Sequence, residues 1–237
     1  MKKINVILML LPLVALIGCK NVEKKQPQAE TTLVEQAPIE KLLTMFSGEF
    51  DSIDQMRADQ KEDSIPEDDK HGRVNRIFVR VNAPKVGKYI LVGSTRYNGH
   101  DDKPWYFDKT EFLVWIFEED TNGKTITMRP KKFKDIESKI PHVRDSVKLS
   151  GFGPEDLEDG KSGAICHIVW TPTETGFSGR NKPCKVFSTT TQQLLNFKWE
   201  YELDEGGMFA EVNGLDDDGK IIYSTPGIAP YRLKRVN

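Results

Sequence analysis

The sequence is poor in cysteine and histidine, and the few that it has are not spaced as metal ligands. Among 237 residues there are three cysteines and four histidines. No two histidines have the i, i+4 spacing of a zinc-binding helix, and Cys166 and Cys184 are too far apart to form a Cys-x-x-Cys knuckle. We therefore expect no metal site.

An excess of charge of one sign and the short motifs of hydrolytic enzymes are also missing. The 34 basic residues are offset by 36 acidic residues, which gives a net charge of −2 at pH 7, so nucleic acid is not an expected partner. The chain has no Gly-x-Ser-x-Gly and no Ser-x-x-Lys motif for a nucleophilic serine. An active site assembled from distant strands leaves no such local signature, so these absences do not exclude an enzyme.

A long apolar run occurs only near the N-terminus. Lys2 and Lys3 precede "INVILMLLPLVALIG", which has about the length of the apolar region of a signal peptide. The run ends in "LIGC", which resembles the lipobox of bacterial lipoproteins, whose cysteine is diacylated and becomes the mature N-terminus. This resemblance implies a signal peptide over 1–18 and a membrane anchor through lipid on Cys19. The protein would then lie in the cell envelope, at the outer membrane and facing the periplasm if the source is Gram-negative. The alternative is an ordinary secretory signal that contains a cysteine.

The sequence changes character after this segment. Residues 19–37 are polar and rich in Gln, Glu and Lys, so we expect a flexible tether. A single folded domain is expected over 38–237. Its first element is an amphipathic helix, because apolar residues recur with helical spacing between Ile39 and Phe46.

Beyond this helix the apolar residues alternate with polar ones, as is typical of β-strands. About ten short strands are expected, separated by turn signals such as Asn122-Gly123 and Asp218-Gly219. The strand candidates are "NRIFVRV", "KYILVGSTRY", "EFLVWIFEE", "GKTITMRPK", "AICHIVWT", "CKVFSTTT", "NFKWEYELD", "GMFAEVNGLD", "GKIIYST" and "YRLKRV". Such a pattern with one convincing helix predicts an all-β domain, either an antiparallel barrel or a sandwich. The stretch 132–160 is less regular, and its place in the fold stays open.

Polar and aromatic residues of one loop, together with aromatic residues of the strand candidates, mark a possible ligand pocket. The candidates are His100, Asp101, Trp105, Tyr106, Trp115, Trp199 and Tyr201. Either these side chains pack in the core and at the rim of the fold, or they form the wall of a small-molecule pocket that contains a few polar groups.

Four segments follow one another along the domain: "LLTMFSGEFDSIDQ", "CHIVW", "GFSGRNKPC" and "GIAPYRLKRV". Taken in this order, they resemble the CpcT/CpeT family of phycobiliprotein chromophore lyases. In the first segment, Gly48, Phe50, Ser52 and Gln55 match the family's glycine, aromatic residue, serine and glutamine. The resemblance spans nearly the whole domain. It implies a calycin-like or lipocalin-like antiparallel β-barrel that binds a linear tetrapyrrole (bilin) and delivers it to a cysteine of an acceptor protein.

The chain departs from the family where polar contacts to the bilin are implied. Tyr89 and Pro104 can be aligned, which makes Tyr89 a further pocket candidate, but a glutamate is absent, and Asp108 and Lys109 replace arginines. Two functions stay open. One is a lyase that attaches or handles a bilin, which would be its ligand or substrate and not a covalently bound cofactor. The other is a non-catalytic lipoprotein of the same fold that binds a small apolar ligand or an envelope partner. No catalytic residue is assigned.

The two cysteines of the domain are expected to pair. If "TPTETG" is the turn of a hairpin, Cys166 lies opposite Lys182 to Cys184 on the next strand, where Cα atoms are about 4.5 to 5.5 Å apart. With Cys19 acylated in an oxidising compartment, we expect a disulfide between Cys166 and Cys184 that stabilises the fold by about 3 kcal/mol. Two buried free thiols are the alternative.

Overall fold

Strands make up most of the described chain. The computed structural model describes residues 36–99, 107–159, 166–188, 191–224 and 230–236, which belong to one unit, Gln36–Asn237. The strands are β1 (Gly48–Asp51), β2 (Arg73–Arg80), β3 (Tyr89–Gly99), β4 (Phe107–Glu119), β5 (Ile126–Phe133), β6 (Leu157–Glu158), β7 (Ile168–Pro172), β8 (Gly176–Asn181), β9 (Cys184–Ser188), β10 (Gln193–Asp204), β11 (Gly207–Leu215), β12 (Ile221–Ser224) and β13 (Tyr231–Val236). The helices are α1 (Pro38–Phe46) and α2 (Ile53–Gln60), with short 3-10 turns η1 (Glu67–Asp69), η2 (Ile140–His142) and η3 (Pro154–Asp156). Within these ranges no helix has both the length and the apolar character needed to cross a bilayer.

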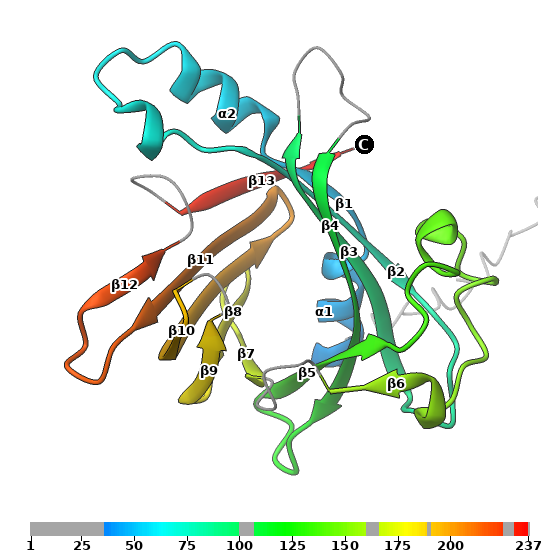
Figure 1. The fold of residues 1–237 in the computed structure, drawn as a ribbon. Coiled ribbons are helices and arrows are strands. Elements are labelled where there is room, and N and C mark those ends of the chain that lie inside the picture. Colours follow the sequence, from blue (N-terminus) through cyan, green and yellow to red (C-terminus); the bar gives the residue numbers. More distant parts are fainter. Residues whose placement is uncertain (1–35, 100–106, 160–165, 189–190, 225–229, 237) are drawn as a thin grey trace, which may run out of the picture. The chain divides into compact units, whose positions relative to one another are not determined.

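Ten of these strands close into an antiparallel barrel (Figure 1). Each strand of the ring β1-β2-β3-β4-β5-β7-β8-β10-β11-β13 pairs with the next, and β13 pairs back onto β1. The remaining strands β6, β9 and β12 extend the sheet beside the ring. The predicted fold class, an all-β barrel of about ten strands, is therefore confirmed, and the sandwich alternative is excluded.

The inner face of the barrel is set by the period of two in each strand. In β2, Val74 and Phe78 belong to the interior apolar cluster, whereas Ile77 between them points outward. In β4, Trp115 and Phe117 face inward and Val114 faces outward. Both faces of β4 are buried, because the stretch that could not be placed from the sequence covers the outside of this strand. Alternation alone thus did not reveal which set of side chains faces the interior.

This covering stretch packs with apolar side chains against the outer face of the barrel. Leu149, Phe152 and Leu157 are buried there together with residues of β3 and β4. Phe152 meets Phe133 edge to face, with 4.9 Å between ring centroids. The stretch therefore covers the side of the barrel, and "PEDLEDG" contributes the single turn η3.

Helix α1 fills one end of the barrel. Figure 1 shows it between β8 and β10 on one side and β3 and β4 on the other. Its Leu42 and Leu43 are fully buried, and Phe46 packs edge to face on Phe78 and Trp170, with centroid distances of 4.7 and 5.2 Å. Burial of each such side chain stabilises the fold by about 1.5 to 3 kcal/mol. The expected N-terminal amphipathic helix is thus observed.

Helix α2 is a second helix in the described chain, and it was not expected from the sequence. Its sequence "IDQMRADQ" has one buried residue, Met56, which leaves no apolar period for the pattern to detect. Ser52 precedes the helix and ties it to the barrel: its hydroxyl oxygen accepts a hydrogen bond from the Val74 amide at 2.8 Å.

Strands β7 and β8 form the hairpin expected around "TPTETG". Ile168 pairs with Asn181, and the structure joins Cys166 and Cys184 in a disulfide with 5.6 Å between their Cα atoms. Strands β8 and β9 both pair with β10, and the register of this pairing shifts between them. Asn181 lies at the shift. Its side chain donates to the Phe197 carbonyl at 2.7 Å and accepts from the Trp199 amide at 2.7 Å.

Candidate ligand-binding site in the barrel

The two halves of the barrel interior differ in polarity. The half filled by α1 lies where β2 ends, because Glu40 of α1 pairs with Arg80 at 2.6 Å. The half toward the start of β2 and the end of β3 contains ionisable side chains. We call five of them the interior polar cluster: Arg76, Tyr97, Glu111, Tyr201 and Tyr231. They come from five different strands, so the closed barrel is what brings them together.

Arg76 projects inward between Val74 and Phe78. Its guanidinium lies over the ring of Tyr201 on the far wall, 5.7 Å from the centroid, and its Nη1 donates to the Met208 sulfur at 3.2 Å. The Arg76 Nε atom is buried and has no hydrogen-bond acceptor in the described chain. A buried cationic donor without an acceptor is costly in a folded protein. The position therefore fits an anionic or carbonyl group of a ligand.

Tyr97 and Glu111 form the second polar element of the interior. The Tyr97 hydroxyl donates to Glu111 Oε2 at 3.1 Å, and Lys109 Nζ pairs with Glu111 Oε1 at 2.9 Å. Lys109 also lies over the Tyr97 ring, 5.4 Å from its centroid. The Glu111 side chain is 42% exposed, so this carboxylate stands at the accessible edge of the cluster and is able to accept further N–H groups.

The three tyrosines of the cluster are held in their neutral form. Burial raises the pKa of Tyr97 far above its usual value, and the negative charge of Glu111 is the second largest cause. Burial also raises the pKa of Tyr201 and brings the pKa of Tyr231 to about 12. Because a buried phenolate is disfavoured by desolvation, these residues present hydroxyl donors throughout the physiological range.

Tryptophan side chains add donors that also have no acceptor. The indole Nε1 atoms of Trp115, Trp170 and Trp199 are buried without a hydrogen-bond partner in the part of the chain that the structure describes. Trp115 lies over Gly93, where an added Cβ would come within 2.6 Å of its Nε1. Gly93 therefore leaves room for this indole. Buried donors without partners are rare in folded proteins, so ordered water or a bound acceptor is expected to satisfy these N–H groups.

The structure places some of the predicted pocket residues in this interior. Trp115 and Tyr201 belong to the interior apolar cluster, and Trp199 packs against it. Tyr89 also packs against this cluster, with Lys88 over its ring at 4.7 Å. His100, Asp101, Trp105, Tyr106 and the lipidation candidate Cys19 lie outside the described residues.

The sequence interpretation missed four members of the interior polar cluster. Arg76, Tyr97, Glu111 and Tyr231 stand within strand candidates, where a polar residue reads as solvent-facing. The available signal was their register. Arg76 is two residues from Val74 and Phe78, and Glu111 is two residues from Leu113, so each shares a face with apolar neighbours.

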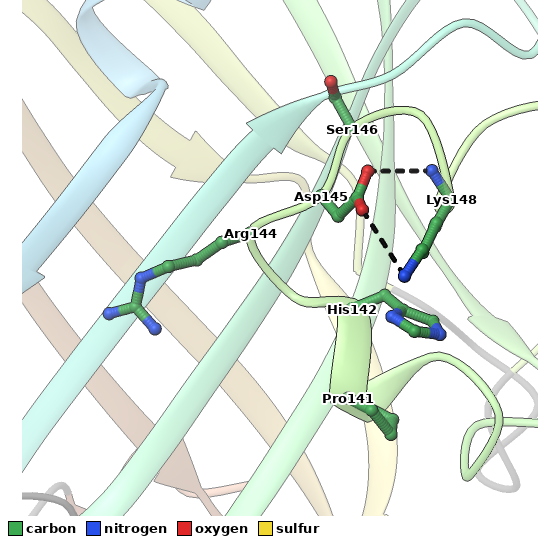
Figure 2. A pocket seen from close by; sticks show the side chains of 6 residues that line it. All are labelled: Pro141, His142, Arg144, Asp145, Ser146 and Lys148. Carbon is green, nitrogen blue, oxygen red and sulfur yellow. Dashed lines mark hydrogen bonds and ion pairs between the residues drawn. The ribbon is translucent and has the colours of Figure 1, made fainter.

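The hollows on the protein surface are weaker candidates for a ligand-binding site than the barrel interior. One, of about 460 Å³, is lined by Pro141, His142, Arg144, Asp145, Ser146 and Lys148. Figure 2 shows that Arg144 points away from His142 and Lys148, and it pairs with Glu49 at 2.5 Å. Asp145 bonds to Lys148 within the same loop. The charged groups of this hollow are already paired with other protein groups, so the hollow has little charge left with which to bind a ligand.

No metal centre is assembled in the described ranges. There, no group of three or more His, Cys, Asp or Glu side chains is placed to hold a metal ion.

Comparison with known proteins supports the fold. No protein-family model and no curated protein matches the chain. The structure is similar to the CRL protein of Arabidopsis, with a TM-score of 0.55 and 12% identity over 84% of this chain and 97% of that chain. It is also similar to the T-type phycobiliprotein lyase CpeT from Prochlorococcus phage P-HM1, with a TM-score of 0.48 and 14% identity over 85% of this chain and 100% of that chain. At these identities the likeness concerns the fold alone.

Proposed function

We propose that the barrel binds and handles a linear tetrapyrrole of the bilin class. The observation that carries this proposal is the half-buried Arg76 side chain, whose Nε atom is buried and has no acceptor in the described chain. The motif resemblance to the chromophore lyases, from "LLTMFSGEFDSIDQ" to "GIAPYRLKRV", supports the choice of ligand.

The chemistry of a bilin matches the groups that line the interior. Its propionate carboxylates are acceptors for Arg76, and its terminal lactam carbonyls are acceptors for the indole N–H groups of Trp115 and Trp199. Its pyrrole N–H groups are donors for the Glu111 carboxylate. Its conjugated body would stack on aromatic side chains. A fatty acid satisfies the first of these contacts, but it has no N–H group for Glu111.

Delivery to an acceptor protein is the lyase part of the proposal. The acceptor cysteine would supply the thiol, since Cys166 and Cys184 are joined to each other. The barrel would contribute orientation of the bilin, which is a usual source of rate in an addition of this kind. The Glu111 carboxylate, which accepts from Tyr97 and pairs with Lys109, would help to orient the pyrrole N–H groups.

A non-catalytic role in ligand binding is the second candidate. The observation that favours it is the composition of β4, where Lys109 stands in place of a family arginine and is paired with Glu111. In this case the barrel would bind a small apolar acid at Arg76 and would not transfer it.

We further propose that lipid on Cys19 anchors the protein in the cell envelope. The "LIGC" segment supports this. Labelling of expressing bacteria with an alkyne fatty acid tests it: label is expected on the protein and lost in Cys19→Ala. Labelling of that variant at an unchanged level would contradict the proposal.

Ligand titration tests the main proposal. Biliverdin or phycocyanobilin is added to the purified protein, and the absorption of the bilin is expected to shift and intensify at tens of micromolar protein or below. Such a concentration corresponds to a binding free energy of roughly −6 kcal/mol or more negative. Arg76→Met is expected to weaken binding about tenfold or more, because a charge-assisted hydrogen bond is worth about 1.5 to 3 kcal/mol. The matched control is Arg180→Met, since Arg180 is 74% exposed on the outer face.

The outcomes separate the candidates. No spectral change with either bilin would overturn the tetrapyrrole proposal. Bilin binding without transfer to a cysteine-bearing apo-phycobiliprotein would leave the non-catalytic candidate. Binding and covalent transfer, both lost in Arg76→Met and kept in Arg180→Met, would support the lyase.

A further inference from the structure

Tyr231 is the member of the interior polar cluster that begins the last strand. It is buried, and the positive charge of Arg76 acts on its hydroxyl, where it lowers the pKa that burial raises. Its place inside the barrel depends on how the start of β13 is held. The residues that hold it come from α2 and from the segment before β2, and the proposed function does not use them.

Gln55 of α2 binds the backbone on both sides of Tyr231. Its side-chain Nε2 donates to the Pro230 carbonyl at 3.0 Å, and its Oε1 accepts from the Arg232 amide at 2.8 Å. The Pro230 carbonyl is only an acceptor and the Arg232 amide is only a donor. The orientation of the Gln55 carboxamide is therefore fixed by its partners.

His71 lies against the other side of this carboxamide. The His71 Nδ1 atom is 2.5 Å from Asp59 Oδ2, and the His71 backbone amide donates to the same oxygen at 2.9 Å. The His71 Nε2 atom is 3.3 Å from Gln55 Nε2. The imidazole also packs edge to face on Tyr231, with 5.0 Å between ring centroids.

These contacts determine where the imidazole proton is. Asp59 accepts at Nδ1, so that nitrogen carries hydrogen. Gln55 presents an N–H group to Nε2, so that nitrogen must accept and carries none. The hydrogen bonds to Asp59 and to Gln55 are therefore both satisfied only by neutral His71 with its proton on Nδ1.

We propose that Gln55 is a positioning residue for the ligand site: it fixes Tyr231 inside the barrel, and it does so only while His71 is neutral. The ligand part of this proposal rests on the proposed function. Protonation of His71 places two N–H groups against each other. Gln55 can relieve this by turning its carboxamide, but it then loses both bonds to β13. The start of the strand is released, and Tyr231 leaves the interior polar cluster.

The groups that face His71 oppose one another in their effect on this protonation. From α2, the Asp59 carboxylate favours the imidazolium. Also from α2, the fixed Gln55 N–H disfavours it. From β13, the neutral Tyr231 ring adds no charge. Replacement of Gln55 by a carboxylate removes the opposing N–H group and should therefore reverse the direction of the pH dependence.

The test follows the Tyr231 ring and the ligand separately. Ring resonances of tyrosine-labelled protein are recorded by NMR between about pH 8 and about pH 5, the range in which histidine titrates, with Tyr231 assigned from Tyr231→Phe. In the wild type, the Tyr231 signal is expected to change from its buried position to that of a mobile ring. Biliverdin affinity, titrated in parallel, is expected to fall about fivefold to tenfold, which is about 1 to 1.4 kcal/mol.

Gln55→Glu gives the decisive comparison. Its carboxylate still accepts from the Arg232 amide and now accepts from protonated His71, so this variant should hold Tyr231 better at low pH than at high pH. His71→Gln should lose the pH dependence. The matched control is Gln193→Glu, because Gln193 is exposed at the start of β10; it should keep the wild-type profile.

The two arms distinguish failure of this proposal from failure of the proposed function. A Tyr231 signal that does not change with pH, or a Gln55→Glu profile that matches the wild type, would overturn the positioning role even if biliverdin binds. A reversed profile supports the positioning of Tyr231 whether or not biliverdin binds. Loss of stability in Gln55→Glu with an unchanged Tyr231 profile would show a merely structural role and would also overturn it.

Discussion

The guanidinium of Arg76 lies over the ring of Tyr201, 5.7 Å from its centroid. The two residues stand on β2 and β10, which are not neighbours in the barrel, so the contact crosses the interior. It brings a cation over a ring that stays neutral and therefore keeps its negative face toward the charge. This contact does not satisfy every donor of the guanidinium, because the buried Arg76 Nε remains without an acceptor in the described chain.

Replacement of Arg76 should have opposite effects on stability and on binding. Without ligand, Arg76→Met is expected to leave the free energy of unfolding unchanged or to raise it by about 1 to 3 kcal/mol, because a buried donor without an acceptor is removed and the apolar stem is kept. Urea unfolding of the ligand-free protein measures this. A loss of more than about 1 kcal/mol would mean that the contacts with Tyr201 and Met208 outweigh the desolvation of the charge.

The three tyrosines of the interior polar cluster should ionise late in an alkaline titration. Folding raises the pKa values of Tyr97, Tyr201 and Tyr231, so their contribution to stability is fully present below the usual tyrosine value of about 10. It is lost as the pH rises toward about 12, the pKa of Tyr231. Tyrosinate absorbance in an alkaline titration should therefore show delayed ionisation of these residues together with unfolding. Tyr97→Phe should remove one delayed step, and ionisation of all six tyrosines at the usual pH would contradict the buried cluster.

Loss of the disulfide should lower stability without opening the barrel. Cys166→Ala with Cys184→Ala is expected to reduce the free energy of unfolding by about 3 kcal/mol, because the cross-link closes a short loop. Urea unfolding of the oxidised wild type and the double variant tests this. Retention of the far-ultraviolet circular dichroism of the wild type is expected, since β7 and β8 keep their backbone pairing. Alkylation of both thiols in native protein without reductant would contradict the disulfide.

Truncation of the aromatic side chain of α1 should be among the costliest single changes. Phe46→Ala is expected to lower the free energy of unfolding by about 3 to 5 kcal/mol, since it leaves a cavity among Phe78, Phe117 and Trp170. Thr44→Ala is the matched control on the exposed face of the same helix and should change it by less than about 1 kcal/mol. Equal effects of the two substitutions would show that α1 is not part of the core.

The sequence was most informative where a short-range pattern decides the structure. The helical spacing between Ile39 and Phe46 and the hairpin turn "TPTETG" depend on neighbours along the chain, and both are confirmed. Closure of the barrel depends on pairing between β1 and β13, which are far apart in sequence, so alternation could not choose between a barrel and a sandwich. Resemblance to a known family supplied that choice.

The candidate site was less predictable for a related reason. Arg76 and Glu111 alternate with apolar neighbours whose opposite faces are also buried, so the rule that polar residues face solvent pointed the wrong way. Trp115 and Tyr201 were found because large aromatic side chains in strands suggest both core and pocket. Helix α2 was missed because Met56 is its one buried residue, although Gln55 on this helix holds β13.

The pairing of β1 with β13 has a consequence for how the domain folds. Glu49 pairs with Val236, so the first strand obtains its second neighbour from the last strand of the chain. Most of the sheet can form as hairpins while the chain is still emerging, but the ring closes only after Tyr231–Val236 has been made. Until then the edges of β1 and β11 are both open to pairing with other chains. Closure should therefore be the slow step of folding, and these six residues decide whether the sheet ends as a barrel or remains an open, aggregation-prone ribbon.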